Sequence, residues 1–351
     1  MIPSADDPDL DIAIDGSLAR IRERATELGP SFGALTDAIT LAAQGGKRFR
    51  PALVMAAFDA FRPDGADASA ALSVAAAFEL LHTAFVVHDD VIDHDTMRRG
   101  VPNVGGAFRQ RGYADGADAE GAALLGDAAA ILAGDILLHE AFRLVAMAPT
   151  DPATRDRLLT LLDDAVLVSA AGELADVENS VATRFPSRAA TLDTAFNKTA
   201  VYSFRAPLQA GALLGGADAE AIRVIGDAGG SLGLAFQLVD DLIGAFGSSA
   251  QTGRDSGPDL RETKRTPLVA LARESAEPAR VDESLALART GPVAVREAQL
   301  VLEASGARDR LAGLVADLLD EARTLSRHAV LPDRAGALLR KVADGIEGRI
   351  P

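Results

Sequence analysis

The distribution of apolar residues predicts two long helices, and both end in paired aspartates. Residues 69–95 contain neither Gly nor Pro, and they are apolar on nearly every face of a helix until the sequence VVHDDVIDHD begins. Such a segment spans roughly 25 residues, or about 40 Å, and its all-round apolar surface favours a central position in the fold. A second apolar segment, residues 218–246, ends in FQLVDDLIGAFG.

The rest of the chain also reads as helix. Short segments rich in Pro, Gly and Asp separate the helical stretches, for example at 62–67, 98–106 and 147–152. Runs of β-branched and aromatic residues at period two are scarce, whereas Ala- and Leu-rich stretches recur. No Pro- and Ser-rich linker and no repeat of fixed period divides the chain. The sequence therefore predicts one all-α domain over residues 16–351, preceded by a disordered tail at 1–15.

Composition narrows the class of protein. The chain has 351 residues, of which 48% are hydrophobic, so it can bury a sizeable core. The absence of Cys excludes disulfides and thiolate metal sites and suits a reducing cytoplasm. A net charge of −16 argues against a nucleic acid partner. The acidic N-terminus is unlike a signal peptide, and Glu79, Asp127 and Asp135 interrupt the most apolar runs, so we expect a soluble cytoplasmic protein without membrane spans.

The first acid cluster has the spacing of a metal site. Asp89 and Asp93 lie one helical turn apart on one face, with Asp90 about 100° round the helix. Carboxylates this close resist ionisation unless cations bind them, and hard oxygen ligands suit Mg²⁺, which also bridges to phosphate oxygens. The alternative is a charged helix end in solvent. Asp240 and Asp241 repeat the pattern, and helices that lie antiparallel or splay around one cavity would turn the acids toward each other across its mouth.

Basic residues gather near the starts of predicted helices. The segment GGKRFRP places Lys47, Arg48 and Arg50 just before Pro51, and Pro suits the first turn of a helix. The free N–H groups and the dipole of such a helix start favour an anion. Further basic positions lie in RRG, NKTA and KRTP: Arg98, Arg99, Lys198 and Lys264. Each cluster alone is typical of a solvated patch. Together with paired acids they indicate two polyanion sites, one reached through metal and one by direct contact.

Two polar residues share helix faces with the acids. His82 lies two turns before Asp89; it is either a buried core residue or a donor to a phosphate oxygen. Gln237 lies one turn before Asp241, where its carbonyl dipole could stabilise a positive charge. The same helix carries glycines at i, i+4 and i+7, a stripe that fits either close packing against a neighbouring helix or room for a ligand: Gly226, Gly230 and Gly233.

With these residues assembled, the chain closely resembles the trans-isoprenyl diphosphate synthases, the polyprenyl synthetase family. The resemblance runs from GGKRFRP to DLRETKRTPLVALA, about 220 residues, and more loosely to the C-terminus. LLHTAFVVHDDVIDHDTMRRG resembles the family's first aspartate-rich motif and FQLVDDLIG the second. The resemblance implies an all-α fold in which antiparallel helices surround a large central cavity, usually as a homodimer.

It also implies a reaction, the head-to-tail condensation of isopentenyl diphosphate with an allylic diphosphate (dimethylallyl, geranyl or farnesyl) through an allylic carbocation. Residues implied to hold three Mg²⁺ on the allylic diphosphate are Asp89, Asp90, Asp93, Asp240 and Asp241. Those implied to bind that diphosphate directly are Arg98, Lys198 and Lys264, and those for isopentenyl diphosphate are Lys47, Arg50, His82 and Arg99. Thr199 and Gln237 would line the site near the developing cation.

Elementary chemistry agrees with this reaction. Breaking an allylic C–O bond releases diphosphate, whose growing charge Mg²⁺, Lys and Arg stabilise, and the cation left behind requires a dry apolar cavity. No protein nucleophile is needed, and the sequence suggests none. The chain departs from the family pattern at three places: Gly244 replaces the third acid of the second motif, Arg254-Asp255 replaces Lys-Pro, and Glu173 replaces a common Gln.

Product length is predicted from the residues before the first motif. Phe85 and Ala84 lie four and five residues before Asp89, on the part of the helix that points toward the cavity floor. Two bulky aromatics there would stop the chain near farnesyl, and one small residue deepens the pocket. We therefore expect geranylgeranyl diphosphate (C20), with farnesyl or a longer product as the alternatives. A terpene cyclase or a non-catalytic partner subunit on the same fold is the remaining interpretation.

Overall fold

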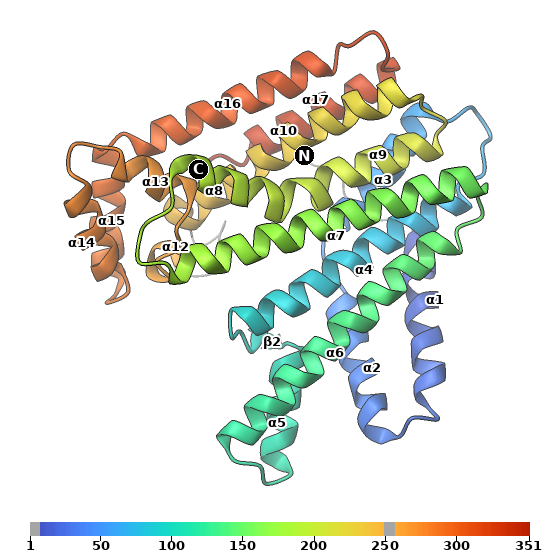
Figure 1. Ribbon diagram of the computed structural model, residues 1–351, viewed down its shortest axis with the longest axis horizontal. Coiled ribbons are helices and arrows are strands. Elements are labelled where there is room, and N and C mark those ends of the chain that lie inside the picture. Colours follow the sequence, from blue (N-terminus) through green and yellow to red (C-terminus); the bar gives the residue numbers. More distant parts are fainter. Residues whose placement is uncertain (1–7, 249–256) are drawn as a thin grey trace. The chain divides into compact units, whose positions relative to one another are not determined.

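The computed structural model describes residues 8–248 and 257–351, and the regular secondary structure of these residues is helical apart from one pair of two-residue strands (Figure 1). The all-α class predicted from the sequence is therefore confirmed. The chain divides into two compact units. The N-terminal unit comprises 8–58 and 63–160, and the C-terminal unit comprises 59–62 and the described part of 161–351. The single domain over 16–351 and the central cavity stay predictions.

The N-terminal unit is built around the long apolar helix that the sequence predicts. Its elements are α1 (Pro8–Ala25), α2 (Pro30–Ala43), α3 (Phe49–Phe61, whose last residues belong to the other unit), α4 (Ser69–Ile92), β1 (Met97–Arg98), β2 (Val101–Pro102), α5 (Val104–Ala114), α6 (Ala119–Ala146) and the start of α7 (Pro152–Val181). In Figure 1, α4 runs beside α6, and it also packs against α1 and α2. Phe78, Leu80 and Leu81 of α4 are fully buried, which confirms the central position of this helix.

The prediction of a disordered tail over residues 1–15 is wrong from residue 8 onward. Helix α1 begins at Pro8, and Leu10 and Ile14 are almost completely buried. These apolar residues are spaced i, i+4, which places them on one helix face. Asp9 and Asp11 in the first turn are favoured by the helix dipole, so the acidic composition that suggested disorder instead suits a helix start. Residues 1–7 lie outside the described residues.

Helix α4 ends slightly earlier than the sequence predicts. Its last helical residue is Ile92 and its C-cap is Asp93, whose backbone N–H still donates to the Asp89 carbonyl at 2.8 Å. His94 then adopts a positive φ of 57°, and this turns the chain out of the helix. Asp89 and Asp93 therefore both belong to the last turn, as their spacing predicts.

The C-terminal unit is built around the second predicted helix. Its elements are the rest of α7, α8 (Arg188–Ala195), η1 (Phe196–Arg205), α9 (Ala206–Leu214), α10 (Ala219–Phe246), α12 (Pro258–Arg261), α13 (Pro267–Arg273), α14 (Pro278–Ala288), α15 (Pro292–Ala304), α16 (Ala307–Leu325) and α17 (Asp333–Glu347). Asp218 caps the start of α10 by accepting from the Ala221 N–H at 2.8 Å. Helix α10 packs against η1, α9, α16 and α17 (Figure 1). The departure at Arg254 and Asp255 lies outside the described residues.

The glycine stripe of α10 serves close packing. A Cβ at Gly226 would lie 2.4 Å from the Gln209 amide nitrogen, and one at Gly233 would lie 2.6 Å from the Cα of Ala200. Of the two interpretations of this stripe, the packing one is confirmed. The neighbour at Gly226 is α9, and the neighbour at Gly230 and Gly233 is η1, a ten-residue π-helix. The sequence did not predict this rare geometry, which is frequent at functional sites.

Within residues 8–248 and 257–351, two helices are long and apolar enough to cross a bilayer by length and composition alone. In α4, 67% of the most apolar window is buried inside the structure, as expected for a core helix. In α6 the corresponding share is 39%. The exposed face of α6 carries large apolar side chains, which is relevant to the oligomeric state of the protein.

Candidate active site

The first acid cluster is joined to the arginine that follows it. Asp90 is 5% exposed, and its Oδ1 accepts from the Arg98 Nε at 3.0 Å and from the Arg98 Nη2. Burial raises the pKa of the Asp90 carboxyl, and the hydrogen bond and charge of Arg98 oppose that rise. The structure thus brings together two residues that the sequence placed at one diphosphate site.

The RRG sequence forms a tight hairpin. Strand β1 pairs with β2 so that Arg98 stands opposite Val101, which leaves Arg99 and Gly100 as a two-residue turn. Both turn residues have positive φ, 53° and 80°, as the favoured hairpin turns require. The Arg99 guanidinium is thereby carried to the loop of the GGKRFRP segment, where its Nη1 donates to the Gln44 carbonyl at 3.3 Å.

The two glycines of GGKRFRP make room for this arginine. Gly45 and Gly46 have φ of 73° and 89°, which disfavours other residues there. A Cβ at Gly45 would lie 3.2 Å from the Arg99 Nη1, and one at Gly46 would lie 3.4 Å from the Arg99 Nη2. The GG dipeptide therefore sets both the loop conformation and the close approach of Arg99.

One basic residue of this loop has a structural role. The Arg48 Nη1 donates to the Glu79 Oε1 at 2.9 Å and to the Ala43 carbonyl at 3.0 Å, and Glu79 is buried on α4. This buried pair fixes the loop to the core helix. Lys47 stays exposed and Arg50 is partly buried in the first turn of α3.

His82 lies among the arginines predicted to bind isopentenyl diphosphate. Burial first, and then the charges of Arg50, Arg98 and Arg99, hold the pKa of His82 well below its ordinary value of 6.5. The imidazole is therefore neutral at neutral pH and carries one ring N–H. The charges of Arg50 and Arg99 act on His82, so these three of the four residues predicted to bind isopentenyl diphosphate lie near one another.

In the C-terminal unit, a hydrogen-bond chain links three predicted residues. The Thr199 hydroxyl on η1 donates to the Gln237 Oε1 at 2.8 Å. The Gln237 Nε2 donates to the Asp241 Oδ1 at 3.0 Å. Because the Gln237 carbonyl accepts from Thr199, its orientation is fixed by the π-helix beside it.

Asp241 is the most perturbed acid of the candidate site. It is 6% exposed, and its buried Oδ2 has no hydrogen-bond partner within the described chain. Burial, followed by the negative charge of Asp259, raises the pKa of Asp241 to about 8, and Asp240 adds to the effect. A cation beside the carboxylate would offset this cost.

This perturbation predicts a pH dependence for the metal-free protein. The unfolded chain releases the Asp241 proton near the ordinary pKa of 3.8, whereas the folded chain releases it near about 8. Protonation of Asp241 therefore stabilises the folded state fully below about pH 4, and this stabilisation is lost as pH rises through about 8. In EDTA, we expect Tm to fall more steeply between about pH 5 and about pH 8 for the natural chain than for Asp241→Asn. Parallel Tm profiles in differential scanning fluorimetry would contradict this assignment.

Asp240 contacts a residue that sequence reasoning missed. The Arg349 Nη2 bonds the Asp240 Oδ1, and its guanidinium lies over the Phe236 ring at 4.3 Å. Arg349 follows α17, over a hundred positions from the motif it contacts. No local pattern marks it, because the C-terminal stretch resembles the family only loosely.

The two lysines predicted to bind the allylic diphosphate are paired with carboxylates. The Lys198 Nζ lies 2.9 Å from the Glu173 Oε2 and 2.9 Å from the Asp176 Oδ2, both on α7. The Lys264 Nζ lies 3.4 Å from the Asp259 Oδ1. A diphosphate that binds these lysines must compete with their carboxylate partners. At position 173 the family commonly has a neutral Gln, so Glu173 adds a competitor for Lys198 that a Gln would not.

One observation on the candidate metal ligands fits Mg²⁺ binding, and a second one does not. The buried, unpartnered Oδ2 of Asp241 is a hard oxygen that a cation would satisfy. Across residues 8–248 and 257–351, no three His, Asp or Glu side chains are already arranged to hold a metal. Mg²⁺ typically binds through one or two carboxylates, waters and substrate phosphates and does not need a complete protein cage.

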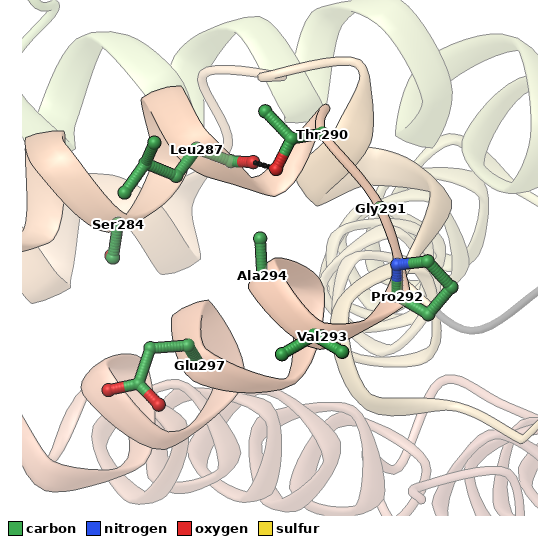
Figure 2. Close-up of a pocket in the computed structure, with 8 residues that line it drawn as sticks. All are labelled: Ser284, Leu287, Thr290, Gly291, Pro292, Val293, Ala294 and Glu297. Atoms are coloured by element: carbon green, nitrogen blue, oxygen red, sulfur yellow. Dashed lines mark hydrogen bonds between the residues drawn. The ribbon is translucent and has the colours of Figure 1, made fainter.

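A separate hollow of about 460 Å³ lies between α14 and α15 (Figure 2). Its lining is mostly small and apolar, with Leu287, Pro292 and Val293 among its residues and Glu297 as its single ionisable side chain. No Lys or Arg lines it, so it lacks the groups that hold a diphosphate. The predicted site residues are not part of it.

Comparisons with known proteins agree with these motifs. The polyprenyl synthetase family profile matches residues 34–304. A short chain isoprenyl diphosphate synthase from Methanothermobacter thermautotrophicus is 32% identical over 262 residues, 73% of this chain and 72% of that protein. An octaprenyl diphosphate synthase from Escherichia coli is 33% identical over 222 residues, 63% of this chain and 60% of that protein.

A solved structure shows the same fold over the whole chain. The geranylgeranyl pyrophosphate synthase of Corynebacterium glutamicum, complexed with isoprenyl diphosphate and magnesium, superposes with a TM-score of 0.86 at 26% identity. The match covers 98% of this chain and 99% of that one. The chain therefore belongs to the polyprenyl synthetase family of prenyltransferases and has the all-α isoprenoid synthase fold.

Proposed function

We propose that this protein condenses isopentenyl diphosphate head-to-tail with allylic diphosphates in a Mg²⁺-dependent reaction. The observation that carries the proposal is Asp241, a buried carboxylate with an unpartnered oxygen beside a second acid and a polar chain to Thr199. A cation would satisfy this oxygen, and the relative solved with isoprenyl diphosphate also contains magnesium. When bound, Mg²⁺ would neutralise the charge that develops on the departing diphosphate.

The chain's own residues divide this work. Residues proposed to hold cations on the allylic diphosphate are Asp89, Asp90, Asp93, Asp240 and Asp241. Those proposed to bind that diphosphate directly are Arg98, Lys198 and Lys264, and those for isopentenyl diphosphate are Lys47, Arg50, His82 and Arg99. The neutral His82 donates a hydrogen bond without adding to the positive charge of its neighbours. The Thr199–Gln237 pair presents fixed dipoles near the carbon that becomes cationic.

The test is a product assay. The purified protein is incubated with labelled isopentenyl diphosphate and each allylic primer, with Mg²⁺ or with EDTA, and the products are sized by chromatography. We expect chain elongation that stops in EDTA. Full turnover without a divalent metal would contradict the mechanism. An inactive protein that stimulates another synthase would favour the partner-subunit interpretation.

We propose geranylgeranyl diphosphate as the main product, because one of the residues four and five positions before Asp89 has a small side chain. Ala84 is fully buried, whereas Phe85 is partly exposed and shares a helix face with Asp89. We expect Phe85→Ala to shift the product distribution toward chains at least one C5 unit longer in the same assay. A main product beyond C25 from the natural chain, or an unchanged distribution in Phe85→Ala, would contradict this role.

We also propose a homodimer in which α6 faces a second copy. Leu124, Ile131 and Leu132 are 70%, 47% and 53% exposed and form one stripe at i, i+7, i+8. Contiguous exposed apolar stripes of this kind mark interaction surfaces. We expect light scattering after size exclusion to give a dimer mass, and Leu124→Glu with Leu132→Glu to give a monomer.

Leu287→Glu is the matched control for this surface, because Leu287 is equally exposed at 53% but lies on α14. It should leave the dimer intact. A natural chain that is monomeric in solution and cosediments with lipid vesicles would show that the α6 stripe binds a membrane instead.

A further inference from the structure

The loop that follows the first acid cluster is held by one residue at the start of the next helix. Asn103 directly precedes α5, and its backbone N–H donates to the Thr96 carbonyl at 3.1 Å. Its side-chain Nδ2 donates to the Asp95 carbonyl at 2.8 Å. These two hydrogen bonds close the segment between Asp95 and Asn103 into a loop, and the β1–β2 hairpin that carries Arg98 lies within it.

The Asn103 amide has a fixed orientation. Its Oδ1 accepts from the Gly106 N–H at 2.8 Å and so caps the start of α5. The oxygen end is thereby engaged with the helix, and the NH2 end, which has two N–H donors, faces the loop. A Cβ at Gly106 would clash with the Thr96 carbonyl oxygen, which belongs to the backbone. The glycine therefore allows the start of α5 to approach the loop closely enough for Asn103 to reach it.

The same residue is connected to the acid cluster itself. The Asp95 N–H donates to the Asp90 carbonyl at 2.9 Å, so the loop that Asn103 holds is joined to the last turn of α4. The Asn103 side chain also donates to the Asp90 carboxyl: burial raises the pKa of Asp90, and the hydrogen bonds from Arg98 and Asn103 lower it. Asn103 thus contacts Asp90 and holds the loop that brings Arg98 back to Asp90.

We infer that Asn103 is a positioning residue for the first acid cluster, and that it acts by holding the Arg98–Asp90 pair in the arrangement that receives the allylic diphosphate. The inference rests on the proposed function, in which both members of the pair serve that diphosphate, and it adds a residue from outside the motif. Without the Asn103 amide, the loop loses its side-chain link to α5. Small displacements of groups that orient a substrate reduce binding and rate strongly.

A purely structural account assigns Asn103 only to the cap of α5. Asn103→Ser separates the two roles, because Ser caps a helix about as well as Asn but has no amide donor. Asp118 provides the matched control for capping. It caps α6 by accepting from the Gly121 N–H at 2.8 Å, the same geometry as at α5, and it is exposed.

The first experiment measures diphosphate binding apart from turnover. Isothermal titration calorimetry follows the binding of inorganic pyrophosphate to each full-length variant in Mg²⁺, with EDTA as the metal-free reference. We expect Asn103→Ser to weaken the Mg²⁺-dependent binding about 10-fold, the size seen when residues that support a ligand set are changed. Its Tm should stay within about 2 °C of the natural chain. Asp118→Ala should show the opposite profile, a lower Tm with binding within about twofold.

Steady-state kinetics test whether Asn103 acts through Arg98. Asn103→Ser should raise KM for the allylic primer about 10-fold. It should leave KM for isopentenyl diphosphate within about twofold, because Arg99 is held separately by the Gln44 carbonyl. In an Arg98→Ala background, Asn103→Ser should add less than about twofold, since residues that act through one another are not additive. A purely structural loss would affect both KM values alike and would multiply in that background.

The outcomes keep this inference apart from the proposed function. Unchanged pyrophosphate binding in Asn103→Ser, equal binding losses in Asn103→Ser and Asp118→Ala, or multiplying losses in the Arg98→Ala background would overturn the role of Asn103 while leaving an active Mg²⁺-dependent synthase intact. A natural chain that binds Mg²⁺ and pyrophosphate, more weakly in Asn103→Ser, but forms no prenyl product would overturn the proposed function alone.

Discussion

We expect Asp89→Ala and Asp241→Ala each to lower kcat for the proposed prenyl transfer by about 10³-fold, and the double variant to be little worse than either single one. In the proposed mechanism, cations held by these carboxylates would supply several kcal/mol of stabilisation to the departing diphosphate, and 10³-fold corresponds to about 4 kcal/mol. Residues that act as one unit on one step lose activity non-additively. Single-turnover rates with an allylic primer, compared across the double-mutant cycle, measure this coupling.

A control for this cycle is available on the same helix as Asp241. Asp227 of α10 is paired with Arg223 at 2.7 Å, three turns and more from the motif. Exposed pairs of this kind contribute little to stability, so Asp227→Ala should leave kcat unchanged. Losses that simply multiply in the Asp89→Ala, Asp241→Ala double variant would mean that the two motifs serve different steps.

We expect Gly172→Ala and Gly233→Ala each to lower the free energy of unfolding by about 2 kcal/mol, although Ala is the better helix former. A Cβ at Gly172 would lie 2.3 Å from the Lys198 backbone nitrogen, and one at Gly233 would lie 2.6 Å from the Ala200 Cα. Both clashes fall on the backbone of the π-helix η1, which cannot move aside as a side chain can. Urea unfolding followed by circular dichroism measures the loss.

The opposite sign is expected at Gly313. This glycine lies on the exposed side of α16, and nothing stands within 4 Å of a Cβ built there. Gly313→Ala should therefore raise the free energy of unfolding by about 0.5–1 kcal/mol. Equal effects at the three glycines would show that helix propensity alone, and not the approach of η1, decides them.

The destabilised variants should also affect activity. Lys198 and Thr199 both lie on η1, and Thr199 orients Gln237. A displaced π-helix would therefore misplace groups that are proposed to lie at the reaction site, and small shifts of this kind reduce rates strongly. This links a packing feature of α10 to the chemistry of the site.

Much of the protein follows from local pattern. The all-α class, the burial of α4, the start of α10 at Asp218 and the placement of paired acids at helix ends follow from apolar periodicity and from helix-start chemistry, because these depend on residues a few positions apart. The basic loop before Pro51 and the resemblance to the family were predictable for the same reason, because both depend on short sequence motifs. One error came from composition: the acids near residue 9 suggested disorder, where the buried Leu10 and Ile14 show a helix.

Only the tertiary structure decided which groups meet across long separations. The Asp259 carboxylate in the space beside Gly244, Arg349 on Asp240 and the π-helix against the α10 glycines all join residues brought together by packing. No sequence period encodes such contacts, because they depend on how helices approach one another and on which backbone lacks a Cβ. The sequence by itself determined which chemical groups this protein carries; the fold decided which side chains share each hydrogen bond and each buried space.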